Sequence, residues 1–232
     1  MLQVNSTLSS LLLNGNNIQA EGAEYISKAL EINTSLTTLT LGGNDIGEGF
    51  YYLSKALERN STLLTINLNF TSFKSNYVFK ALEKNCGLTT LICCYNTLGF
   101  QDTQYLSQML ETNSTLTELN LGENNIRDEG LKLIFKSLES NSTLRIFDLN
   151  HNRICPEGAR YISNTLKANK GLTKLDISYN RIEDEGVDHI AQALATNSIL
   201  TFLDVSSNDI SDKGFKSISQ ALITNTTILT IK

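Results

Sequence analysis

The sequence is dominated by a repeat of 28 residues. Residues 116–126 read LTELNLGENNI, which is the pattern L-x-x-L-x-L-x-x-N-x-I, and the pattern starts again at Leu144 after a stretch with helical periodicity. Self-similarity at such a period is the signature of an array in which each unit buries its apolar face against its neighbours. The repeat therefore requires the chain to fold as a stack of similar units.

The repeats begin at regularly spaced leucines, and a partial ninth repeat begins at Ile228. The eight leucines that open a full repeat are Leu8, Leu36, Leu63, Leu88, Leu116, Leu144, Leu172 and Leu200. Successive starts lie 28 residues apart, except for intervals of 27 and 25 at the second and third steps. Because a solenoid has no internal domain boundary, we predict that residues 1–232 form a single unit. The short third repeat predicts a disturbed helix near Tyr77.

Each repeat contains the pattern of one strand and one helix. In the seventh repeat, the alternation around Leu175 predicts a short strand with one face inward. Val187, Ile190 and Leu194 then share one face of a helix. Asp184, which precedes Glu-Gly, is predicted to cap the start of this helix. A helix is about 10 Å wide and paired strands lie about 4.8 Å apart, so the stack bends into a right-handed α/β horseshoe with its parallel sheet inside.

Two columns of asparagines recur along the repeats. The first follows the predicted strand and consists of Asn16, Asn44, Asn96, Asn124, Asn152, Asn180 and Asn208. Because buried backbone groups need partners, we predict that these side chains point inward and bridge successive turns, with Thr71 as the exception. The second column follows the helix and consists of Asn33, Asn60, Asn85, Asn113, Asn141, Asn169, Asn197 and Asn225. We interpret it as a helix stop in the left-handed conformation.

Several asparagines of the second column lie in N-x-S/T sequons, for which glycosylation is the alternative interpretation. The segment 1–5 lacks the charged and apolar regions of a signal peptide, which favours the structural interpretation. The four cysteines, Cys86, Cys93, Cys94 and Cys155, do not form a disulfide framework. These observations favour an intracellular, cytoplasmic setting.

The composition excludes several function classes. A net charge of −5 disfavours a general nucleic-acid binder or a protein that binds anionic membranes. No apolar run has the length of about 18 residues that a membrane span needs. The cysteine spacing does not fit a metal site, and no phosphate loop or catalytic triad motif is present. We therefore predict a protein without cofactor or metal that is not an enzyme.

Repeats that end in A-L-x-x-N-x-T-L resemble the ribonuclease-inhibitor-like class of leucine-rich repeats, most closely the arrays of NOD-like receptors. Similar arrays occur in bacterial effectors and in Ran-type activators of GTPases. The resemblance implies a protein-interaction horseshoe, either a microbial effector acting in the host cytosol or a receptor-type sensor array. An alternative is a GTPase regulator of the Ran type, with Arg153 or Arg181 as its candidate residues. Such a fold is nearly silent on the partner.

The predicted binding surface is the open face of the sheet together with its adjoining turns. Its residues are Phe70, Ile92, Cys94, Tyr95, Glu118, Asp148, His151, Arg153, Lys174, Asp176, Tyr179, Arg181, Phe202 and Asp204. Phe70, Ile92, Cys94 and Tyr95 form an apolar centre in this prediction.

The three aspartates of this set form an acidic stripe beside the apolar centre. This arrangement fits a protein partner with a basic rim, bound by a monomer or by a segment of a larger protein. Two alternatives stay open. Aspartate is common in such strands, and the aromatic and arginine side chains can simply pack against the next turn.

Overall fold

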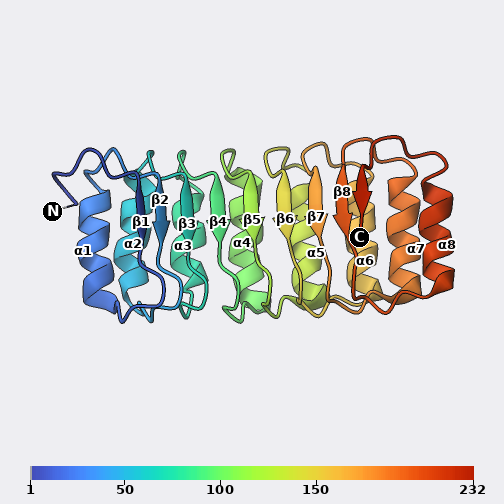
Figure 1. Cartoon of the computed structure of the whole chain (residues 1–232), viewed down its shortest axis with the longest axis horizontal. Helices are drawn as coiled ribbons and strands as arrows, with labels where there is room; N and C mark the ends of the chain where they lie inside the picture. The colour runs from blue at the N-terminus through green and yellow to red at the C-terminus, as the bar shows by residue number, and fades with distance from the viewer. Residues whose placement is uncertain (1) are drawn as a thin grey trace.

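The computed structural model describes residues 2–232 and shows two layers, a sheet and a row of helices (Figure 1). The strands are β1 (Ser10–Leu12), β2 (Thr38–Thr40), β3 (Thr65–Asn67), β4 (Thr90–Ile92), β5 (Glu118–Asn120), β6 (Ile146–Asp148), β7 (Lys174–Asp176), β8 (Phe202–Asp204) and β9 (Thr230–Ile231). The helices are α1 (Ala20–Leu30), α2 (Gly49–Arg59), α3 (Ser75–Leu82), α4 (Phe100–Thr112), α5 (Arg127–Leu138), α6 (Pro156–Leu166), α7 (Glu183–Leu194) and α8 (Asp212–Ala221).

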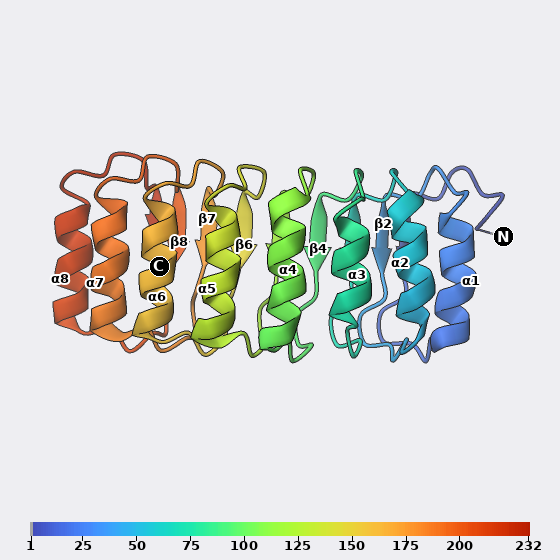
Figure 2. The same cartoon turned by 180° about the vertical axis from the view of Figure 1, so that it is seen from behind.

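The strands form one parallel sheet in the order of the chain, β1 to β9. Inward residues pair in register, as Leu119 with Phe147 and Leu175 with Leu203, and all four are fully buried. The row of helices extends beyond the row of strands at both ends in Figure 1, and Figure 2 shows the helices covering the other face. The sheet therefore lines the shorter, inner side, which confirms the predicted α/β horseshoe. No helix within residues 2–232 has the length and apolarity needed to cross a membrane.

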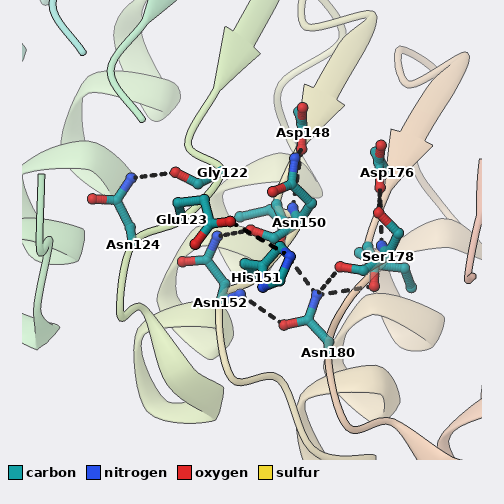
Figure 3. A network of polar contacts seen from close by, with 12 residues as sticks. Gly122, Glu123, Asn124, Asp148, Asn150, His151, Asn152, Asp176, Ser178 and Asn180 are labelled. Carbon is teal, nitrogen blue, oxygen red and sulfur yellow. Dashed lines mark hydrogen bonds and ion pairs between the residues drawn. The ribbon is translucent and has the colours of Figure 1, made fainter. Parts of the chain in front are cut away.

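The asparagines that follow the strands form the predicted ladder between turns (Figure 3). Asn180 donates from Nδ2 to the carbonyl of Leu149 in the preceding repeat and to that of Ile177 in its own. Its Oδ1 accepts the backbone N–H groups of Asn152 and Ile154 at 2.8 and 3.0 Å. Each buried asparagine of this column thus satisfies backbone groups of two repeats, as buried polar groups require. The prediction is wrong for Asn16, which is exposed and donates only to the carbonyls of Leu13 and Asn14 in its own repeat.

The third repeat lacks this connection to the repeat before it. Thr71 is fully buried, and its hydroxyl donates only to the carbonyl of Leu68, at 2.6 Å within its own repeat. A threonine has one short hydroxyl where asparagine has an amide with separate donor and acceptor atoms. The ladder therefore has a missing rung between the second and third repeats.

The interpretation of the second asparagine column as a left-handed helix stop is wrong. Asn60 and Asn113, which end α2 and α4, have φ angles of −77° and −71° in the extended region. Asn60 accepts the N–H groups of Thr62 and Leu63 and donates to the carbonyl of Leu30 in the preceding repeat. The column is a second ladder along the other edge of the sheet, and burial of its side chains supports the structural interpretation of the sequons.

The prediction that Asp184 caps its own helix is also wrong. Ile182 precedes α7 without a capping hydrogen bond from its side chain. The Asp184 carboxylate instead accepts the N–H and hydroxyl of Ser211, at 2.8 and 2.6 Å, and the N–H of Gly214 at 3.0 Å. Asp184 lies inside the first turn of α7, so its side chain reaches the start of α8 and caps that neighbouring helix.

The helix α3 has eight residues, while each of the other helices has at least ten. Lys74 precedes α3 without a side-chain cap, and the Glu-Gly entry of other repeats is absent. The Ser75 hydroxyl instead donates to Asp102 of the next helix. The predicted disturbance near Tyr77 is therefore present as a shortened helix.

We expect α3 to show the weakest amide hydrogen-exchange protection of any helix between α2 and α7. A shorter helix has fewer internal hydrogen bonds and fewer neighbours, so it opens locally at lower free energy. Exchange measured by mass spectrometry with peptides covering 63–87 and 116–143 tests this. Equal protection of the two segments would show that the third repeat packs as firmly as the fifth.

Candidate protein-binding surface

The acidic stripe lies in one column of the sheet, in the register Asn120, Asp148, Asp176 and Asp204. Each aspartate accepts, through Oδ1, the backbone N–H of the residue two positions later, at 2.9 to 3.0 Å. The same oxygen also accepts from the side chain of that residue, as from the Ser178 hydroxyl at 2.6 Å (Figure 3). The column therefore shapes the turns after the strands, which supports a structural role for these aspartates.

Two carboxylates of the stripe still carry unbalanced charge. Asp148 and Asp176 are half-buried and lie side by side on neighbouring strands. Among the described residues, 2–232, no lysine, arginine or histidine forms an ion pair with either carboxylate. Burial raises the pKa of Asp148, the hydrogen bonds from Asn150 oppose this, and the charge of Asp176 raises it further. Asp204 differs, because it is buried and Lys232 Nζ lies 3.7 Å from its Oδ2.

Two stacked aromatic pairs stand on the turns beside this stripe. The rings of Phe70 and Tyr95 lie 4.1 Å apart with planes 13° from parallel. The rings of His151 and Tyr179 lie 4.5 Å apart with planes at 9°. All four side chains are exposed, and all four residues have positive φ angles between 51° and 58°. Gly15 and Gly43 occupy the same position of the first two repeats.

Glu123 lies on the turn between the two aromatic pairs. Its carboxylate is 3.4 Å from Nε2 of His151 (Figure 3). On the other side, its negative charge raises the pKa of the Tyr95 hydroxyl above the usual range. Glu123 thus lies between the Phe70–Tyr95 pair and the His151–Tyr179 pair, and the five residues form one row along the turns of five successive repeats. The sequence interpretation did not single out Glu123, although its place before the turn asparagine is the one that Tyr95 and His151 also occupy.

The structure removes Cys94 from the open face. Only 8% of this residue is exposed, and its thiol donates to Asn120 Oδ1 at 2.8 Å. Burial raises the pKa of Cys94 to about 11, and the negative charge of Asp148 adds to the rise. The prediction that Cys94 belongs to an exposed apolar centre is therefore wrong, and so is the expectation that Asp204 is exposed.

The remaining predicted residues do reach the surface. Lys174, Arg153 and Arg181 are exposed, and none of these three forms an ion pair with another described residue. Ile92, Glu118 and Phe202 are half-buried on the outward side of their strands. Together with the aromatic pairs, Glu123, Asp148 and Asp176, they form what we call the inner surface of the horseshoe.

Comparison with known proteins assigns the chain to a family. A family model described as leucine-rich repeat matches residues 4–27, 33–48, 112–135, 140–163, 168–191 and 196–219, more than half of the chain. The chain is a leucine-rich repeat protein. Proteins of this family are generally non-enzymatic scaffolds for protein interactions, so the coarse function of this leucine-rich repeat protein is protein binding. A search of curated protein sequences finds no significant match.

Two solved structures illustrate the likeness of this leucine-rich repeat protein to others. Leiomodin-1 actin-binding site 2 is 30% identical, with a TM-score of 0.52, over 54% of this chain and 75% of that chain. Human 5T4, also named trophoblast glycoprotein, is 17% identical, with a TM-score of 0.64, over 98% of this chain and 81% of that chain. At this identity, the likeness to 5T4 supports the fold alone.

Proposed function

We propose that this leucine-rich repeat protein binds a protein partner on the inner surface of its horseshoe. The observation that carries the proposal is the pair of exposed aromatic stacks on left-handed backbone. A residue with a side chain costs roughly 1–2 kcal/mol in that conformation, which glycine avoids. Four bulky side chains stand there while remaining open to solvent. Exposed aromatic side chains on a rigid support are the residue type that anchors protein interfaces.

The charges beside the stacks support a partner with a basic rim. Glu123, Asp148 and Asp176 lie along three successive repeats, and the two aspartates lack a cationic partner within the described chain. At the end of the same column, Lys232 lies between Asp204 and the ring of Phe202, 5.1 Å from the ring centroid. A lysine of the partner could bind Asp148 or Asp176 in the same way that Lys232 binds Asp204.

The finer properties of this function are also proposals. The two subtypes are a microbial effector and a receptor-type sensor array, acting in the cytoplasm as a monomer or as a segment of a larger protein. No catalysis by the chain itself is proposed. Leiomodin-1, whose matching region is named an actin-binding site, supports a protein as the ligand and makes actin a first partner to assay.

The experiment that tests the proposal is affinity purification from the native cell with the intact chain as bait. The variant Phe70→Ala with Tyr95→Ala serves as the paired bait. A protein recovered with the wild type and lost with the variant supports the proposal. Partners recovered equally by both baits would contradict it, because the stacked rings of Phe70 and Tyr95 would then contribute nothing to binding.

A second candidate function is regulation of a GTPase. Arg153 and Arg181 are exposed on neighbouring turns and form no ion pairs in the described part of the chain, so both are open to a partner. An assay of GTP hydrolysis by a panel of small GTPases discriminates the two functions. Acceleration that Arg153→Ala or Arg181→Ala reduces favours the regulator, while binding without acceleration favours the scaffold.

Reversing the acidic charge should slow association with the partner. We expect Asp148→Lys with Asp176→Lys to lower the association rate about tenfold or more at low salt and to reverse its salt dependence, because long-range attraction becomes repulsion. Surface plasmon resonance at several salt concentrations measures both effects. The matched control is Glu111→Lys with Glu139→Lys on exposed ends of α4 and α5. Equal rates for the two variants would show that charge on the inner surface has no role.

A further inference from the structure

A basic patch lies on the edge of the sheet where the strands begin, opposite the turns that carry the aromatic stacks. It consists of one residue directly after α6, one in the loop from α6 to β7 and one directly before β6 (Figure 1): Lys167, Lys170 and Arg145. All three residues are exposed. No acidic residue occurs in 158–175, and none occurs in 189–203 of the next repeat. The patch lies between interior repeats, so it does not depend on where the chain begins or ends.

The other repeats carry no positive charge at the three positions of the basic patch. Lys167 stands two residues before the asparagine that follows the helix, and the first five repeats all have glutamate there: Glu31, Glu58, Glu83, Glu111 and Glu139. The position of Lys170 holds serine, threonine or cysteine in every other repeat, and that of Arg145 holds serine, threonine or leucine. Positive charge is therefore concentrated where the sixth repeat meets the seventh.

On the same edge of the second and third repeats, the chain neutralises its own cations. Arg59 lies 3.8 Å from Glu31, and Lys84 lies 3.7 Å from Glu58. Among residues 2–232, by contrast, no carboxylate forms an ion pair with any residue of the basic patch. Even Glu139, directly after the neighbouring α5, pairs with none of them. The charge of the basic patch is thus left for a ligand.

The Arg145 side chain is held in place by the loop from α6 to β7. Its Nη1 donates to the carbonyl of Gly171 at 2.9 Å, and its own carbonyl accepts the N–H groups of Thr173 and Lys174. A Cβ at Gly171 would lie 2.9 Å from the carbonyl oxygen of Leu144, so the loop packs directly on the start of the preceding strand. A guanidinium has five N–H donors, and this bond uses one. A guanidinium fixed in this way can bind a carboxylate through two N–H groups with less loss of entropy.

The size of the basic patch and the net charge of the chain favour an acidic peptide among anionic ligands. A net charge of −5 repels an extended polyanion such as nucleic acid or an anionic membrane. Lipid headgroups are commonly bound by clusters of about four to eight basic residues, and nucleic acid by a comparable number of phosphate contacts. The basic patch is smaller than these clusters. Its three cations match a short run of carboxylates.

We propose that the basic patch binds an acidic segment of a protein partner, a run of aspartate or glutamate. Arg145 pairs with one carboxylate through two N–H groups, and the ammonium groups of Lys167 and Lys170 neutralise its neighbours. The acidic stripe ends β6 and β7, whereas the basic patch lies where these strands begin. Opposite charges at the two ends of the same strands give one orientation to a partner that contacts both. Binding of the acidic segment itself does not require the inner surface.

A labelled peptide of about six glutamates, which spans roughly 20 Å when extended, tests the basic patch. We expect saturable binding to the intact protein by fluorescence polarisation, an affinity that falls as salt is added, and no binding of the matching glutamine peptide. Arg145→Thr with Lys170→Ser introduces residue types that other repeats carry. It should raise the Kd at least about tenfold, because charge-assisted hydrogen bonds to carboxylates are lost. Lys167→Glu should also weaken binding, and circular dichroism verifies that both variants fold.

The matched control is Arg59→Gln with Lys84→Gln, which removes the same charge from the same edge at positions that are already paired. Its Kd should equal that of the wild type. Phe70→Ala with Tyr95→Ala should also bind the peptide normally, so failure of the inner surface does not affect this result. The proposal is overturned by absent saturation, by equal Kd values for the patch variants and the matched control, or by binding of anionic lipid vesicles or a single-stranded oligonucleotide in place of the peptide.

Discussion

Replacing Asn180 with alanine should lower the free energy of unfolding by about 2–4 kcal/mol, since buried polar groups cost about 1–3 kcal/mol each when left unpaired. The Asn180 side chain accepts the N–H groups of Asn152 and Ile154 and donates to three carbonyls. Alanine provides neither donor nor acceptor, and the site is too buried for water to replace the amide without rearrangement. Both the sixth and the seventh repeats are therefore destabilised by one substitution.

Thermal and urea unfolding of Asn180→Ala measure this effect, with a drop in Tm of roughly 5–15 °C for a chain of this length. The matched control is Asn164→Ala, the same substitution at an exposed position of α6. We expect the control to leave stability unchanged or slightly higher, because alanine favours helix. If both variants unfold at the same temperature, the asparagine ladder contributes no measurable stability to the fold.

The double variant Phe70→Ala with Tyr95→Ala should weaken partner binding about a thousandfold or more, because truncating an aromatic anchor commonly costs 2 kcal/mol or more. The two rings stack on each other and present one flat, rigid surface to solvent. Rigid presentation lowers the entropy lost on binding. The variant should fold normally, since both rings lie outside the core and alanine at positive φ carries the same backbone cost as phenylalanine or tyrosine.

Titration calorimetry with the purified partner tests this expectation. Tyr25→Ala with Tyr52→Ala removes two exposed tyrosines from the helix layer and is the matched control. Loss of affinity only in the first variant places the partner on the inner surface. Loss only in the control would instead move the binding site to the outer, helical face of the horseshoe.

The fold could be predicted from sequence because its interactions repeat with the period of the chain. Leu119, Leu175 and Leu203 occupy equivalent positions, and the structure buries all of them in one column. Within each repeat, the spacing of the apolar residues changes from every second residue to every third or fourth, and this change predicted where the strand ends and the helix begins. The turn asparagines were also predictable, because unpaired backbone groups at a turn demand a side chain that donates and accepts.

The predictions for Cys94 and Asp184 failed because both depend on which side chain or backbone group of the next repeat lies against the residue. Cys94 follows the strand on its outward side, but Asn120 of the next repeat covers it and binds its thiol. Asp184 looks like a cap of the helix that contains it, yet its partners lie 27 to 30 residues later. Spacing within one repeat gives the direction of a side chain, but it does not give its depth or its partner in the next repeat.

The substitution of threonine for asparagine at position 71 has a mechanical consequence. Between most repeats, an amide fastens one turn to the next, but the Thr71 hydroxyl bonds only within its own repeat. When the two ends of the protein are pulled apart, every junction between repeats carries the same force. The junction that lacks these side-chain hydrogen bonds between turns should therefore open first. The first two repeats should then separate from the following six, which stay folded.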